Sequence, residues 1–194
     1  MIILNPITRQ NVARVLSQTL NANYPVTLQK RIMNDMLWAI TCDSDEGQID
    51  GIKYSQVYWS TGAIKRRNNN IANGINRNKG LRHEHLVPKN LIRNIINNLS
   101  EVNEELILRI INQYNHAVIV TIEEDKILRE NGFKNNLPKA FEIENYNNPS
   151  AKLLFSRYIE SEIPLFKVQI DNHIVTNEYD KLRFVNNTFE IIED

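Results

Sequence analysis

The sequence has few of the residues that form disulfides or cysteine-based metal sites, and it has no long apolar segment. It has a single cysteine, Cys42, so neither an intramolecular disulfide nor a zinc site built from cysteine pairs can form. The apolar stretch before Asn5 and Pro6 is too short for a signal peptide. No window approaches the roughly 18 consecutive apolar residues of a membrane span. We therefore expect a soluble protein of a reducing, cytoplasmic compartment, with no membrane partner.

The chain also lacks an excess of charge of either sign. Lys plus Arg and Asp plus Glu each number 23, so the formal net charge is zero. This balance excludes a histone-like basic protein and an acidic DNA mimic as descriptions of the whole chain. Any nucleic-acid-binding surface has to be a local patch. The hydrophobic fraction of 42% and the length of 194 residues are those of one ordinary globular domain.

Apolar residues recur at spacings of three and four along much of the chain, which predicts a mostly helical domain of the α+β class. The predicted helices cover residues 7–20, 27–42, 60–67, 88–99, 101–114, 121–132 and 151–160. Candidate N-caps open four of them, namely Thr27, Ser60, Ser100 and Thr121. Pro88 fits the first turn of its helix, Glu124 completes a capping box, and Gly132 is expected to end that helix.

A small β component is predicted beside the helices. Residues 81–87 read as an extended segment, and the β-branched run at 117–120 is typical of a buried strand. Alternation over 165–170 and 181–185 predicts a terminal hairpin. Polar loops are predicted at 43–51, 68–80 and 135–150. We divide the single domain, 1–194, into a helical part with a basic loop (1–80), a candidate active-site region (81–132) and a C-terminal loop, helix and hairpin (133–194).

The densest cluster of reactive side chains lies at residues 82–88, Arg-His-Glu-His-Leu-Val-Pro. On an extended strand His83 and His85 point to one face and Glu84 to the other. Two imidazoles can then approach one metal ion, or one can act as a base while the other binds phosphate. If the strand ends at His85, Glu84 and His85 can instead converge on one site. The plainer alternative is a pair of surface histidines on an edge strand.

Next to this cluster, the segment between Ile64 and His83 contains basic residues and no acidic residue. The basic residues are Lys65, Arg66, Arg67, Arg77, Lys79 and Arg82. Guanidinium and ammonium groups donate hydrogen bonds in several directions, as phosphate contacts require. The segment is therefore a candidate nucleic-acid-binding surface, and the alternative is a solvated helix face.

The string Glu84-His85-Leu86-Val87-Pro88 resembles the acid-His-x-x-Pro signature of HNH, or His-Me finger, endonucleases. The resemblance implies that Glu84 ligates a divalent metal, Mg2+, and that His85 is the general base that activates water. It also implies a ββα unit whose helix carries another ligand, here Glu124 or Asp125. His83 and His116 are further candidate metal ligands.

A longer stretch, with Trp59-Ser60, residues 118–124 and Arg157-Tyr158, resembles a group of bacterial and phage proteins known only as HNH-like or uncharacterised. Two predicted helices separate the two strands, so a ββα unit here needs a helical insertion. Asn is too frequent for the middle Asn of an HNH site to be assigned.

Two other motifs are weaker. Arg109 and His116 are similar in spacing to the Arg-x4-6-His motif of HEPN ribonucleases, which act on RNA without a metal. Residues 43–50 are acidic, but their order does not follow that of a calcium loop, so a solvated turn is favoured.

Together these patterns favour a metal-dependent nuclease that hydrolyses phosphodiester bonds in phage defence or restriction, with Mg2+ as cofactor and DNA rather than RNA as substrate. A site-specific enzyme on duplex DNA is expected to be a homodimer. The alternative is a non-catalytic accessory protein of a phage or defence system that grips nucleic acid or a protein partner with the same basic loop. A nuclease needs Glu84, His85 and a third ligand around one ion, whereas a binding protein needs only the exposed basic loop.

Overall fold

The computed structural model describes the backbone of residues 6–42, 56, 58–138, 151–171, 174–185 and 188–192, and the side chains of 9–41, 56, 58–138 and 154–166. In this part of the chain, helices predominate over a single mixed sheet, which is the α+β arrangement that the sequence predicts. The acidic segment 43–50 and the larger part of the predicted loop 135–150 lie outside the described residues.

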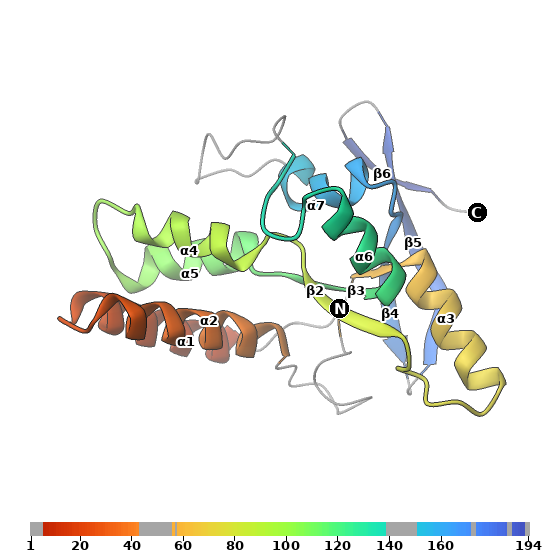
Figure 1. Ribbon diagram of the computed structural model, residues 1–194, viewed down its shortest axis with the longest axis horizontal. Coiled ribbons are helices and arrows are strands. Elements are labelled where there is room, and N and C mark those ends of the chain that lie inside the picture. The colour runs from red at the N-terminus through yellow and green to blue at the C-terminus, as the bar shows by residue number, and fades with distance from the viewer. Residues whose placement is uncertain are drawn as a thin grey trace.

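Four helices form a lobe at one end of the molecule, on the left of Figure 1. They are α1 (Pro6–Asn21), α2 (Val26–Cys42), α4 (Lys89–Asn97) and α5 (Glu104–Tyr114). Their apolar stripes meet in one core, which includes the fully buried side chains of Leu16, Leu37 and Ile92. The apolar periodicity of these four segments therefore reflects the packing of their helices against one another in this lobe.

Two helix starts in the lobe differ from the prediction. α2 begins at Val26, so Thr27 lies inside the helix and is not its cap. α5 is capped by Asn103, whose side-chain oxygen accepts a hydrogen bond from the amide of Leu106 at 2.9 Å. The predicted cap at Ser100 is wrong because Asn103 supplies the same acceptor three residues later.

The sheet joins segments from the middle and the end of the chain. Its strands are β1 (Tyr58–Ser60), β2 (Leu81–His85), β3 (Ala117–Thr121), β4 (Leu165–Asp171), β5 (Ile174–Val185) and β6 (Thr188–Ile192), in the order β2-β3-β1-β4-β5-β6. β3 pairs parallel with β1 and antiparallel with β2. All of β3 is buried, as expected of a strand that is covered on both faces.

The two faces of β3 belong to different clusters. Ile119 packs with Trp59 and with Ala63 of α3 (Thr61–Ala72). Val118 and Val120 pack on the other face, with residues of α6 (Ile122–Glu130) and α7 (Ala151–Glu160). α3 therefore covers one face of the sheet, and α6 and α7 cover the other.

α3 is longer than the sequence predicts. Ser60 caps it, as expected, by accepting a hydrogen bond from the amide of Ala63 at 3.0 Å. The helix then continues to Ala72, so the predicted loop over 68–80 is wrong for its first turn. The asparagine run shows no apolar period because the buried position in it, Asn70, is polar: its side-chain amide donates to the carbonyls of Arg77 and Lys79.

β2, β3 and α6 follow one another as strand, strand and helix, with α4 and α5 inserted between the two strands, which is the order that the ββα unit implied by the resemblance would need. α6 contacts both strands. The capping box of Thr121 and Glu124 is present, and Gly132 follows the helix with a φ of +79°. The sequence was sufficient to predict the ends of α6, because the residues that cap a helix are its immediate neighbours in the chain.

The C-terminal elements also follow the prediction. α7 covers residues 151–160, and β4 and β5 pair antiparallel with Phe166 opposite Lys181. β6 adds a strand that the sequence analysis does not predict. Among the described residues, no helix is long and apolar enough to cross a membrane.

Candidate functional site

β2 separates the two members of the predicted catalytic pair. The strand stays extended through His85, with His83 opposite Ile119 and His85 opposite Ala117 of β3. Side chains alternate across a strand, so Glu84 lies on the face opposite to both histidines. The convergence of Glu84 and His85 on one site, which a turn at His85 would allow, is not formed.

His83 and His85 are packed against the C-terminal part of α2. The ring centroids lie 5.7 Å apart, and the Trp38 ring lies 4.8 Å from that of His83 and 5.9 Å from that of His85. His83 Nε2 is 3.1 Å from the carbonyl oxygen of Thr41. Each histidine is only 5% exposed, so the alternative of two surface histidines is wrong.

His85 is held as a neutral imidazole. Burial, followed by the charges of His83 and Lys89, lowers the pKa of His85 well below its usual value, and a hydrogen bond with the backbone of Leu37 only partly opposes this. Its Nε2 is buried and has no hydrogen-bond partner within the described part of the chain. The ring is in the protonation state of a base, but its burial separates it from the water that a hydrolytic base would activate.

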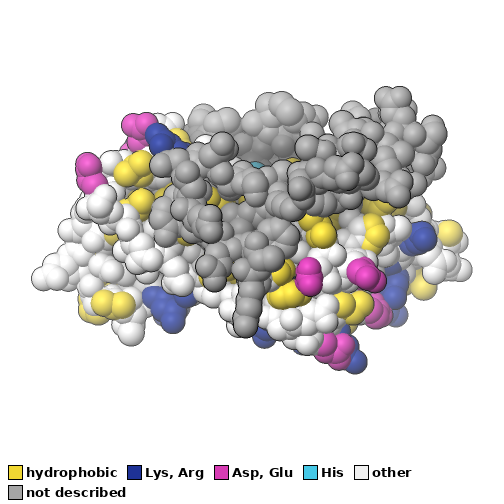
Figure 2. Space-filling view, turned by 90° about the horizontal axis from the view of Figure 1, so that it is seen from above, with side chains coloured by type: hydrophobic (Ala, Val, Ile, Leu, Met, Phe, Trp, Pro, Cys, Tyr) yellow, Lys and Arg dark blue, Asp and Glu magenta, His cyan; other side chains and the backbone are white. Residues whose placement is uncertain are grey.

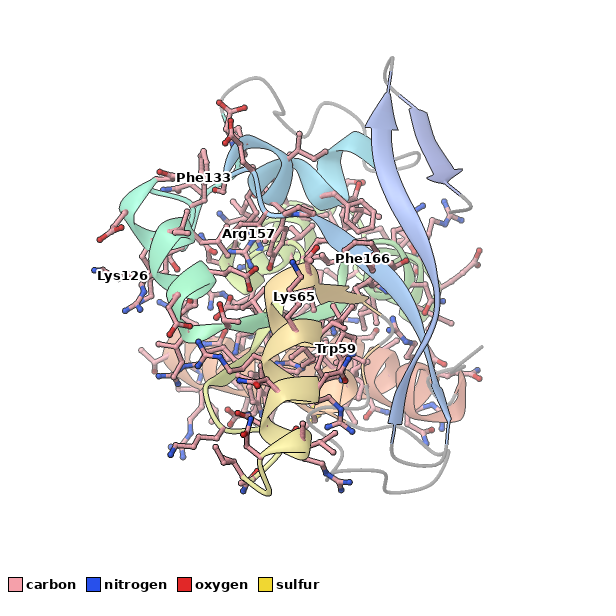
Figure 3. The ribbon with its side chains drawn as sticks, turned by 90° about the vertical axis from the view of Figure 1, so that its right-hand side faces the viewer. Trp59, Lys65, Lys126, Phe133, Arg157 and Phe166 are labelled. Carbon is pink, nitrogen blue, oxygen red and sulfur yellow. The ribbon has the colours of Figure 1, made fainter. Side chains whose placement is uncertain are left out.

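Glu84, on the other face, is engaged by Arg157 of α7. Arg157 Nη2 donates to Glu84 Oε2 at 3.3 Å, and its side chain is 1% exposed. The same guanidinium donates to the carbonyls of His85 and Phe133 and to the hydroxyl of Tyr158. Figure 3 shows Arg157 in the interior, beside the sheet. Arg157 therefore ties α7 and the segment after α6 to the end of β2.

The pKa of Glu84 is shifted in opposite directions by its neighbours. Burial raises it, the charge of Arg157 lowers it, and the charge of Asp125 on α6 raises it further, with a net upward shift. Asp125 itself pairs with Arg129 at 3.2 Å. The charge of Asp125 thus acts on Glu84 from the α6 side of the strand, which is the side that the HNH resemblance implies for the metal.

His116 lies apart, at the entrance of β3. Its Nε2 is 2.9 Å from the carbonyl oxygen of Asn112. Burial and the charge of Arg9 lower its pKa to about 4. Arg9 is itself buried and donates to the carbonyls of Ile111 and Asn115. These contacts give His116 and Arg9 structural roles at the junction between the lobe and the sheet.

The predicted metal-ligand set of Glu84, His83 and His116 is therefore not assembled. No group of three or more His, Cys, Asp or Glu side chains in the described ranges could hold a metal ion. Glu84 is already neutralised by a buried arginine, and His83 lies across the strand from it. The residues that the structure describes do not fit a complete Mg2+ site.

The predicted basic residues divide into structural and exposed ones. Arg67 is 1% exposed, lies 5.7 Å from the Trp59 ring and donates to Asn78 Oδ1 at 3.3 Å, so its assignment to the nucleic-acid surface is wrong. Arg66 pairs with Glu123 at 3.1 Å. The residues that are exposed are Lys65, Lys79 and Arg82, whereas Arg77 is half-buried. We call Lys65, Lys79 and Arg82 the basic surface. Lys65 and Lys79 belong to α3 and the turn after it, whereas Arg82 projects from the face of β2 that also carries Glu84, at the edge of the sheet.

Sequence reasoning missed the roles of several side chains. Nothing in the pattern assigns Arg157 to Glu84, but one signal was present: Arg157 stands between Leu154 and Tyr158 on the apolar stripe of its helix. Arg109 is exposed and pairs with Glu105 at 3.4 Å, so it is a residue of a solvated helix face. Arg109 and His116 therefore do not form a shared site, although their spacing is similar to that of HEPN ribonucleases.

Comparison of the chain with protein-family models, with curated proteins and with solved structures gives no match. The resemblance to HNH endonucleases therefore rests on the sequence alone, chiefly on the motif at residues 84–88.

Proposed function

We propose that the protein binds nucleic acid through α3, the turn after it and the edge strand β2. The observation that carries this proposal is the distribution of side chains on α3. Ala63, Ile64, Arg67 and Asn70 face inward, while the exposed residues are Lys65, Asn68, Asn69, Ile71 and Ala72. α3 contains no acidic residue, and Lys79 and Arg82 extend its positive charge along the chain.

The interior contacts of this region explain how the basic surface is held in place. The Asn70 side chain fixes the carbonyls of Arg77 and Lys79, and Arg67 is fixed against Trp59 and Asn78. A surface that is ordered before binding loses less conformational entropy when phosphates engage it. Exposed lysines and arginines on such a surface supply the phosphate contacts that dominate nucleic-acid affinity.

Elsewhere among the described residues, several exposed basic side chains pair with carboxylates, namely Arg14 with Glu104, Arg109 with Glu105 and Lys126 with Glu130. Among the described residues seen from above in Figure 2, basic side chains at the right-hand end lie beside acidic ones. Charges that are neutralised in this way contribute little to the attraction of a polyanion. The chain has zero net charge, so α3 with its turn is the region that favours nucleic acid.

The test is a salt titration of binding, measured by fluorescence anisotropy with labelled DNA and RNA. The triple variant Lys65→Ala, Lys79→Ala and Arg82→Ala should bind more weakly and flatten the log–log salt slope by about two to three units, because each lost phosphate contact removes about 0.9. The matched control replaces three exposed lysines elsewhere, Lys30, Lys126 and Lys134, and should keep the wild-type slope. Equal slopes for both triple variants would reject the proposal.

Cleavage of the bound nucleic acid is a second candidate function, in which Glu84 would share a metal ion with a phosphate of the substrate, since the described side chains alone do not form a complete Mg2+ site. Two observations favour it: the order β2-β3-α6, and the position of Glu84 on the face of β2 that α6 covers, with about a third of its side chain exposed. Incubating the protein and DNA with Mg2+, Mn2+ or a chelator tests it. Cleavage that requires metal and is lost in Glu84→Gln would support it. The absence of cleavage with either ion would leave binding alone.

A further inference from the structure

We infer that α3 is a recognition helix that reads base edges in the major groove of double-stranded DNA. This inference rests on the proposed function, and it adds the nucleic-acid class and the way in which sequence is read. In Figure 3, α3 stands in front of the sheet, Lys65 lies on it, and no other described helix or strand is drawn in front of it. Its outer side is thus open to a partner of helical shape.

Four of the exposed residues form one stripe along the helix, and Ile71, which is also exposed, lies beside it. Lys65, Asn68, Asn69 and Ala72 follow each other at spacings of three, one and three, which places them on one face. The helix has 12 residues, hence a length of about 18 Å. The major groove of B-form DNA is about 12 Å wide and admits an α-helix. Between Lys65 and Ala72 the stripe consists of Asn68 and Asn69. Their side chains are short and polar, which permits close approach of the helix to the base edges.

The side chains of this stripe have the chemistry of base readout. An asparagine amide can bond adenine in two places at once, and a small apolar side chain such as that of Ala72 can contact the thymine methyl group. Asn73 Nδ2 donates to Asn69 Oδ1 at 2.9 Å, which orients the Asn69 amide. An amide oxygen has two acceptor sites, so Asn69 can still accept from a base. Phosphate contacts from the basic surface would set the register of the helix.

The inward contacts of α3 give it the rigidity that readout requires. Ser60 caps its first turn, and Ala63 and Ile64 pack against Trp59. Arg66 is held by Glu123 of α6. Contact residues on a rigid helix are positioned more accurately than those on a loop.

Duplex DNA fits this stripe better than RNA does. The major groove of an A-form RNA helix is deep and narrow, and side chains cannot read it. Proteins that bind single strands stack bases on exposed aromatic rings. The segment from Thr61 to Ala72 contains no aromatic residue. The stripe therefore favours B-form duplex over the other nucleic acids.

The experiment selects preferred sequences from a randomised duplex DNA pool with the full-length protein and then measures affinity by anisotropy. We expect the wild type to enrich sites that contain A·T pairs. The variant Asn68→Ala, Asn69→Ala should lose about 5- to 100-fold of the preference for the selected duplex over a scrambled one, the range expected for a lost bidentate contact. Its affinity for the scrambled duplex should stay within about twofold, because phosphate contacts carry no sequence information.

The matched control is Asn94→Ala, Asn97→Ala, which removes two exposed asparagines from α4 and should retain the full preference. Binding to duplex DNA without any preference, or a preference that survives Asn68→Ala, Asn69→Ala, would overturn the inference and leave the proposed function standing. Tighter binding to RNA or to single strands than to duplex DNA would also overturn it. If the wild type binds no nucleic acid, the proposed function fails as well.

Discussion

Arg157 on α7 and Glu84 on β2 form an ion pair between positions 73 residues apart, with 3.3 Å between Nη2 and Oε2. The pair is asymmetric, because Arg157 is fully buried and about a third of the Glu84 side chain is exposed. Arg157 also donates to two main-chain carbonyls, whereas Glu84 remains at the edge of solvent. The arginine is thus the structural member of the pair, and the carboxylate is the member that a ligand could reach.

Replacing Arg157 with Ala should lower the free energy of unfolding by about 3–5 kcal/mol, since it removes a fully buried guanidinium and leaves two carbonyls and the Glu84 carboxylate without their donor. Urea denaturation followed by circular dichroism measures the loss. The control is Arg109→Ala, which removes an exposed pair with Glu105 and should cost less than about 1 kcal/mol. Equal losses for the two variants would contradict the structural role of Arg157.

Lys65 and Arg67 are two positions apart and should respond oppositely to substitution. Arg67→Ala should destabilise the fold by about 1–3 kcal/mol, because it removes a buried donor and its packing on Trp59. Lys65→Ala should leave stability within about 0.5 kcal/mol and weaken nucleic-acid binding. Thermal denaturation and anisotropy of both variants give the comparison. If the Arg67→Ala protein is as stable as the wild type but binds nucleic acid more weakly, Arg67 belongs to the binding surface after all.

The Ser60 hydroxyl links α3 to α6, since it caps α3 and donates to Glu124 Oε2 at 2.5 Å. Ser60→Ala should cost about 1–2 kcal/mol. Glu124→Ala removes the carboxylate that accepts from Ser60 and that also completes the α6 capping box with Thr121, so the double variant should show a coupling of at least about 0.5 kcal/mol. Asn103→Ala, which removes the cap of α5 alone, serves as control and should be additive with Glu124→Ala. Additivity of Ser60→Ala with Glu124→Ala would show that the two caps are independent.

His116 should make stability depend on pH below neutrality. Its pKa is about 4 in the folded protein, against an ordinary histidine value of 6.5 in the unfolded chain, so between these values the unfolded chain binds more protons than the folded one. The stabilising contribution is complete above about pH 6.5 and is lost as the pH falls toward about 4. His85, whose pKa is also lowered, acts in the same direction. Urea denaturation at several pH values for wild type and His116→Gln measures the effect, and parallel curves would refute it.

The sequence predicted the elements whose signals are local. The capping box at Thr121, the buried strand of β3 and the bounds of α7 depend on neighbouring residues, and the structure has all three. The alternation of β2 also correctly separated Glu84 from the histidines. Which of these faces is buried could not be predicted, because burial of His83 and His85 depends on Trp38, which is more than 40 residues away in the sequence.

Buried charges were the other limit of sequence reasoning. In the sequence, Arg67 is simply the third basic residue in a row after Lys65 and Arg66. Only its contacts with Trp59 and Asn78 distinguish it from them. The prediction of a continuous basic loop therefore counted a core residue as a surface residue. The loop predicted over the asparagine run was wrong for a similar reason. Asn70 occupies a buried helix position, where an apolar residue is usual, and donates hydrogen bonds to backbone carbonyls.

The insertion of α4 and α5 between β2 and β3 has a consequence for the order of folding. The two strands pair across more than 30 intervening residues, and closing a long flexible loop costs entropy before any strand contact is made. If α4 and α5 dock against each other first, the ends of the insertion are brought together and the effective loop shortens. Contacts between these helices then belong to the folding nucleus. Truncating Ile96 of α4 or Ile107 of α5, both buried in the core of the lobe, should slow folding more than it accelerates unfolding.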